Sequence, residues 1–246
     1  MSLRTSDAKN CHSQDSLSER LDRVRECVTN AARKSGRAHQ DIVLIGISKM
    51  HPAGLLRAAL EAGIRDLGEN RVQEAEPKIQ ELGRDSARWH LVGHLQPNKA
   101  RKAIRLFDVV HSLDSIALAT RLDRICSEEN RKELSVLIQV DLGGEETKSG
   151  ISERELLPLA ETVRHCERLN LLGLMTLPPF FEDPERVRPF FSRLRELRDD
   201  LKAKGYFATD GELSMGMTHD FEIAIEEGAT MLRIGTAIFG ERGTRQ

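Results

Sequence analysis

The segment Ile42-Val43-Leu44-Ile45-Gly46-Ile47 is the main indication of the fold class of this chain. It is a continuous apolar run with the length of one strand, and it lacks the alternation of a half-buried strand. Such a run is typical of a strand that is covered on both faces, as the strands of parallel sheets are. The sequence therefore predicts a parallel sheet whose first strand ends near Ile47.

Short apolar segments alternate with amphipathic ones through the rest of the chain. Eight strands are predicted to begin near Val43, Ile64, Trp89, Asp108, Ser135, Asn170, Leu213 and Met231. Helices are predicted between them over residues 53–62, 72–82, 99–106, 116–128, 153–165, 187–204 and 221–226. This α/β alternation favours a single (β/α)8 TIM-type barrel, with a doubly wound open sheet as the alternative. The absence of the two common nucleotide-binding glycine motifs weighs against the open sheet.

An extra helix is predicted ahead of the barrel. Ser16 and Glu19 have the spacing of a capping box, and apolar residues then recur at helical spacing up to Gly36. This predicts a helix over residues 16–35. Residues 1–14 are polar and predicted to form a disordered tail, so that residues 15–246 form one barrel domain. Residues 178–184 are rich in proline and read as a long loop between a strand and a helix.

Composition excludes several classes of protein. Of 246 residues, 39% are hydrophobic and 31% are charged, which is typical of a soluble globular chain. The net charge of -2 provides no broad field for phosphate backbones, so nucleic acid is not an expected partner. No apolar run approaches the roughly 18 residues that cross a bilayer, so no membrane is expected either. Four cysteines without a C-x-x-C pair argue against a zinc knuckle or disulfide framework and favour the cytoplasm.

Two basic residues stand where a parallel barrel places its site, at the carboxyl ends of the strands. Lys49 follows the first strand, and a desolvated, neutral lysine amine can attack a carbonyl to form a Schiff base. The alternative is a solvated lysine at a strand end. Arg233 interrupts the last apolar run, where a buried guanidinium needs a partner. The alternative there is a structural ion pair, for example with Glu69.

Two segments near the last strands are suited to a phosphate. Gly235-Thr236 follows the eighth strand, and Ser214-Met215-Gly216 follows the seventh. The loops at these places in barrels often bind phosphate through backbone N–H groups and a hydroxyl. Each signal is weak alone, but their occurrence together with Lys49 and Arg233 at strand ends is hard to produce by chance.

Other candidates are weaker. His90 and His94 are four residues apart on a strand, which is not the helical spacing of a metal pair, and no third ligand is evident. We therefore predict no metal site, a structural role for His90, and a position at the barrel mouth for His94. Glu212 stands where a nucleophile elbow requires glycine, so Ser214 is not expected to be a hydrolase nucleophile.

At these residues the chain resembles the pyridoxal phosphate homeostasis proteins, relatives of the N-terminal barrel of alanine racemase. The resemblance runs from the leading helix to Gly240, and its departures, such as Ile47 and Leu67 in place of the more usual valine and phenylalanine, touch no polar contact. The matching segments are Gly46-Ile47-Ser48-Lys49, Leu67 to Glu74, Trp89 to Lys99, Gly173-Leu174-Met175-Thr176, Leu213 to Thr218 and Met231 to Gly240.

The resemblance implies that pyridoxal 5'-phosphate (PLP) is bound as a Schiff base on Lys49, with Arg233 facing its pyridine nitrogen. The other cofactor-binding residues that it implies are Asn70, Ser214, Gly235 and Thr236, the last three around the phosphate. An arginine disfavours a second positive charge on the ring nitrogen, and a neutral ring is a poor electron sink. Carbanion chemistry is therefore poorly supported.

Catalysis would also need a second acid/base, which the resemblance to alanine racemase assigns to a tyrosine of a second domain. The chain ends six residues after Gly240, and its only tyrosine, Tyr206, follows a predicted helix end at the bottom of the barrel. We therefore expect a protein of PLP and amino-acid homeostasis that stores, shields or delivers PLP without efficient turnover. Acceptor apo-enzymes are the expected partners, and the expected state is a monomer or weak dimer. The alternatives are a weak PLP-dependent racemase or lyase, with His94 as second base, and a scaffold for partner proteins.

Overall fold

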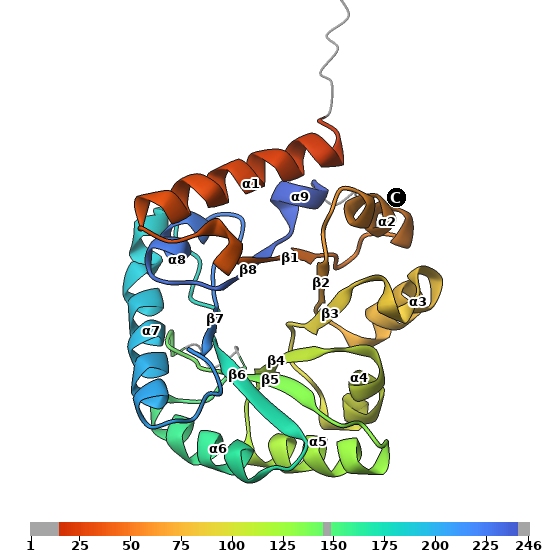
Figure 1. Ribbon diagram of the computed structural model, residues 1–246, viewed down its shortest axis with the longest axis vertical. Helices are drawn as coiled ribbons and strands as arrows, with labels where there is room; N and C mark the ends of the chain where they lie inside the picture. The colour runs from red at the N-terminus through yellow and green to blue at the C-terminus, as the bar shows by residue number, and fades with distance from the viewer. Residues whose placement is uncertain (1–14, 145–148, 241–246) are drawn as a thin grey trace, which may run out of the picture.

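The structure is a computed structural model that describes residues 15–144 and 149–240. Eight parallel strands pair in chain order and close into a barrel, which confirms the predicted (β/α)8 fold and removes the open sheet (Figure 1). The strands are β1 (Val43–Ile47), β2 (Asp66–Glu69), β3 (Arg88–Leu91), β4 (Val109–Leu113), β5 (Leu134–Gln139), β6 (Leu169–Met175), β7 (Glu212–Ser214) and β8 (Met231–Ile234).

Helices surround the barrel and match the predicted ranges closely. They are α1 (Leu17–Lys34), α2 (Ala53–Glu61), α3 (Val72–Leu82), α4 (Ala100–Leu106), α5 (Ile116–Glu128), α6 (Glu153–His165), α7 (Arg188–Ala203), α8 (Phe221–Glu226) and α9 (Thr236–Phe239). Single 3-10 turns occur at His39–Asp41, Arg84–Ser86, Pro97–Lys99 and Pro184–Val187. The sequence did not predict α9, because one turn of helix is too short to show a hydrophobic period. Residues 178–183 form the predicted loop between β6 and the turn before α7.

The leading helix forms as predicted. Ser16 Oγ accepts a hydrogen bond from Glu19 N at 3.2 Å, and Glu19 Oε2 accepts one from Ser16 N at 2.7 Å, which completes the capping box. Arg20 Nε donates to Ile238 O at 2.8 Å, so α1 is tied to α9 across the outside of the barrel (Figure 1). The predicted tail over residues 1–14, with Cys11, lies outside the described residues.

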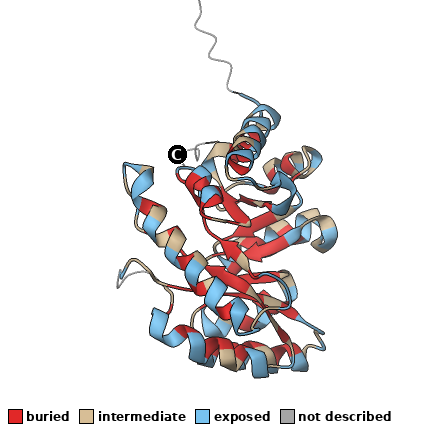
Figure 2. Cartoon of the chain, turned by 60° about the vertical axis from the view of Figure 1, so that its left-hand side comes forward, coloured by how far each residue is buried: buried red, intermediate tan, exposed pale blue. Residues whose placement is uncertain are grey.

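The protein has two apolar layers separated by the strands. One lies between strands and helices, where the strands are mostly buried and the outward helix faces are exposed (Figure 2). The other fills the barrel interior and consists of Ile45, Ile47, Val92, Val109, Leu137, Met175 and Met231. Ile45 pairs in register with both Asp66 and Arg233, so these two charged residues enter the interior at the same level of the sheet.

Two further observations concern partners. No helix in the described ranges is long and apolar enough to cross a membrane. Within the same ranges, no three histidine, cysteine, aspartate or glutamate side chains gather closely enough to hold a metal ion.

Candidate functional site

A cavity of about 570 Å³ opens at the carboxyl ends of the strands. The structure brings five of the six predicted site residues to it: Lys49 after β1, Asn70 after β2, and Arg233, Gly235 and Thr236 on and after β8. Apolar side chains such as Ile47, Val92, Leu177, Phe180 and Met217 form much of the remaining wall. The sixth predicted residue, Ser214, does not line the cavity.

The lysine is placed by a tight turn at the end of β1. Ser48 is buried, and its carbonyl accepts a hydrogen bond from His51 N at 3.1 Å, so that Lys49 and Met50 are the central residues of the turn. Met50 has a φ of 65°, in the left-handed region that residues other than glycine rarely adopt. The turn directs the half-buried Lys49 to the cavity.

A buried ion pair supports the backbone of this turn. Lys78 Nζ, on α3, lies 2.5 Å from Glu69 Oε1 and 2.8 Å from Ser48 O. Ser48 Oγ donates to the same carboxylate oxygen at 2.6 Å. Burial raises the pKa of Glu69, and Lys78 opposes that rise. The alternative that Glu69 pairs with Arg233 is wrong, because the partner of Glu69 comes from a helix outside the barrel.

Arg233 is almost fully buried within β8. Its Nη1 donates to Ser214 Oγ at 2.6 Å, and its Nη2 donates to Thr176 O at 2.8 Å. Burial lowers the pKa of Arg233 to about 10, while Asp220 opposes this, so the guanidinium is charged at neutral pH. A guanidinium carries five N–H donors. Two of them make these bonds, so Arg233 has further N–H donors for the cavity that it lines.

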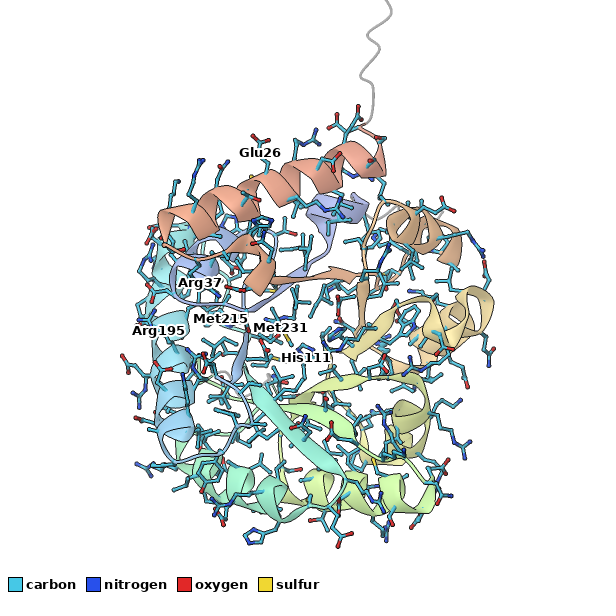
Figure 3. The ribbon with its side chains drawn as sticks, in the orientation of Figure 1. Glu26, Arg37, His111, Arg195, Met215 and Met231 are labelled. Carbon is cyan, nitrogen blue, oxygen red and sulfur yellow. The ribbon has the colours of Figure 1, made fainter. Side chains whose placement is uncertain are left out.

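Ser214 belongs to a polar cluster inside the barrel. Its Oγ lies 2.9 Å from His111 Nδ1, and His111 Nε2 lies 2.9 Å from His90 Nδ1. His90 Nε2 lies 2.9 Å from Asp66 Oδ1. Figure 3 shows His111 within the ring of strands, whereas Glu26 points outward from α1. The sequence indicated neither this cluster nor the part of His111 in it.

Buried histidines predict a pH dependence of stability. Burial lowers the pKa of His90, and lowers that of His111 well below its ordinary value of 6.5. Below about pH 6.5, these two histidines bind protons in the unfolded chain but stay neutral in the folded one. The free energy of unfolding should therefore fall between pH 7 and pH 5. Urea unfolding across this range measures the effect. A stability independent of pH over this window would contradict it.

Two other candidate acid/base residues lie away from the cavity. His94 lines a neighbouring depression of about 610 Å³, and its Nδ1 is 2.9 Å from Asp114 Oδ2. Tyr206 lies beyond the carboxyl end of α7, where its hydroxyl donates to Glu161 Oε2 at 2.6 Å and Arg164 covers its ring. The helix end places Tyr206 at the barrel bottom, as the sequence predicts.

Comparison with known proteins places the chain in a family. A model of the alanine racemase N-terminal domain matches residues 20–243. The chain belongs to this family. Within it, the chain is similar to proteins named pyridoxal phosphate homeostasis protein. It is 44% identical to that of Aquifex aeolicus (91% of this chain, 97% of the relative) and 41% identical to that of Escherichia coli K12 (92% and 97%).

A solved family structure has the same fold. PipY of Synechococcus elongatus, solved without PLP, superposes with a TM-score of 0.82 at 37% identity, covering 92% of this chain and all of that one. The structure of PipY with PLP bound superposes with a TM-score of 0.78. The fold and family that the sequence motifs implied are thus confirmed, while the residue roles remain predictions.

Proposed function

We propose that this chain binds PLP covalently through Lys49 and serves PLP and amino-acid homeostasis, without efficient turnover of its own. The observation that carries the proposal is one cavity that brings together a strand-end lysine, a buried arginine and the turn before α9. The names of the relatives and the PLP-bound structure of PipY support it.

The residues fit such a ligand. The Lys49 amine is the nucleophile at one side of the cavity, and Arg233 supplies a fixed positive donor at another. The first turn of α9 begins after Gly235, and the N–H groups of a first helical turn suit a phosphate. Among the described residues, Ala237 N donates one long hydrogen bond of 3.4 Å, to Thr218 Oγ1. Asn70 borders the same cavity, whereas Ser214 acts through its bond to Arg233.

The same residues favour holding over turnover. PLP supplies an aldehyde that condenses with a primary amine with loss of water. The charged Arg233 facing the ring nitrogen would disfavour its protonation, which weakens the ring as an electron sink. The racemase or lyase alternative needs a second acid/base at the cavity, and His94 and Tyr206 both lie elsewhere. Exchange of the Cα hydrogen of amino acids for deuterium at enzyme-like rates would overturn the claim of no efficient turnover.

Borohydride trapping tests the covalent link. Reduction of PLP-loaded protein, followed by peptide mass mapping, should place one pyridoxyl group on Lys49. Lys49→Ala should remove the label, because the nucleophile is gone. Lys99→Ala is the matched control, since Lys99 lines the neighbouring depression and should not affect labelling. An unmodified Lys49 in PLP-loaded protein would refute the proposal.

Delivery to apo-enzymes is the second part of the proposal. An apo-enzyme should regain activity faster with the PLP-loaded protein than with an equal amount of free PLP. Equal rates would indicate release into solution rather than transfer. We also propose a monomer or weak dimer, which light scattering across a concentration series would establish.

A further inference from the structure

Five side chains form a continuous polar chain through the barrel interior. The chain runs from Asp66 on β2 through His90 on β3 and His111 on β4 to Ser214 on β7, and ends at Arg233 on β8. Its four links measure 2.9, 2.9, 2.9 and 2.6 Å. Buried polar groups are costly unless each is hydrogen-bonded, so a connected chain is the arrangement in which an apolar interior tolerates them.

The two ends give the chain one direction. A guanidinium can only donate hydrogen bonds, and a carboxylate can only accept them. With neutral imidazoles, His90 Nε2–H must donate to Asp66, which leaves His90 Nδ1 to accept from His111 Nε2–H. His111 Nδ1 then accepts from the Ser214 hydroxyl, whose oxygen accepts from Arg233 Nη1. Both histidines are thereby held in the same tautomer, with the proton on Nε2.

We propose that Asp66 is the remote counter-charge of Arg233, and that His90, His111 and Ser214 transmit it as a one-way hydrogen-bond chain. Asp66, His90 and His111 are then positioning residues, which act on the cavity through Arg233 without lining it. The proposal deepens the PLP-binding function and rests on it for the cofactor readout, but the tautomers can be read without any cofactor.

Asp66 is linked to Arg233 indirectly, through three intervening side chains. It is the first residue of β2, its side chain is 18% exposed, and it lines a separate depression of about 400 Å³ with Arg25 and His39. The cavity of Lys49 and Arg233 lies at the other ends of the strands. The other charged groups around the chain are Arg88 and Asp108 near the histidines and Asp220 near Arg233.

Histidine NMR on the protein without PLP tests the chain itself. Long-range proton–nitrogen spectra should show His90 and His111 neutral and protonated on Nε2. Asp66→Leu removes the terminal acceptor while keeping a similar size, and should change the tautomer populations of both histidines. Glu212→Gln, a change of another carboxylate at the first position of a strand, should leave them unchanged. The proposal would be overturned by Nδ1-protonated histidines in the wild type, or by tautomer populations that stay unchanged in Asp66→Leu.

The cofactor readout uses Asp66→Asn, which removes the charge and keeps the shape. If the chain acts through Arg233 on the ring nitrogen, the affinity for PLP should change by about two- to tenfold. A PLP analogue with carbon in place of that nitrogen should bind the wild type and Asp66→Asn equally. Equal changes for both ligands would contradict a role through the nitrogen. Failure of the wild-type protein to bind PLP would instead refute the proposed function. The NMR result would then test the hydrogen-bond chain by itself.

Discussion

Replacing Gly93 with alanine is expected to lower the free energy of unfolding by about 3 kcal/mol and to abolish PLP binding. A Cβ at this position would lie 2.2 Å from Asn70 O, with Asn70 C and Cα at 2.9 Å. These are backbone atoms, which cannot rotate away as a flexible side chain could. The ends of β2 and β3 would have to separate, and Asn70 would leave its place at the cavity.

Urea unfolding and absorbance titration with PLP measure the two effects. Gly54→Ala is the control, since a Cβ there meets no atom within 4 Å on the exposed side of α2. This substitution should leave stability equal or slightly higher, because alanine favours helix. Wild-type stability and PLP affinity in Gly93→Ala would show that the strand ends tolerate the methyl group.

Lys78→Met is expected to cost about 3 to 5 kcal/mol, because it strips a fully buried carboxylate of its cation. Glu69 would then hold an uncompensated charge, and its Oε2 already has no hydrogen-bond partner among the described residues. The pKa of Glu69 should therefore rise further. A raised pKa in the folded state makes the folded carboxyl bind protons more tightly than the unfolded one, so the deficit should shrink as the pH falls toward the ordinary glutamate pKa of 4.5.

The double variant Lys78→Met with Glu69→Gln distinguishes charge from shape. It should recover part of the lost stability, since no unpaired charge remains. Lys102→Met is the matched control, because Lys102 forms an ion pair with Glu76 at 2.7 Å on the surface. Its loss should cost less than about 1 kcal/mol. Similar deficits for Lys78→Met and Lys102→Met would show that burial does not amplify the Glu69 pair.

Two buried polar networks, the Glu69–Lys78 pair and the chain from Asp66 to Arg233, support the same cavity. The pair of Glu69 and Lys78 holds the backbone beside Lys49 through the Ser48 carbonyl. The chain from Asp66 ends on the guanidinium of Arg233. Lys49 and Arg233, two of the groups that would contact PLP, are therefore held in place by buried polar contacts that do not themselves line the cavity, which keeps a site in one geometry.

Local signals account for what could be predicted from the sequence. The apolar run at residues 42–47 and the capping box of Ser16 and Glu19 depend on neighbours within a few positions, and both formed as expected. The rule that parallel strands end at one face then placed Lys49, Asn70, Arg233, Gly235 and Thr236 around a single cavity. The sequence did not predict α9 because its four residues form about one helical turn, which is too short for a hydrophobic repeat to show.

The choice of polar partners could not be predicted from sequence spacing. His111 and Ser214 are 103 residues apart, and no spacing rule links them. Closure of the barrel brings β4 and β7, which do not pair with each other, to face one narrow interior, so Ser214 binds Arg233 and His111 rather than facing the cavity. Glu69 likewise takes Lys78 from α3, not Arg233. Local backbone periodicity was sufficient to predict which residues end the strands. Which of these residues meet depends on closure of the barrel, since hydrogen bonds require contact in space.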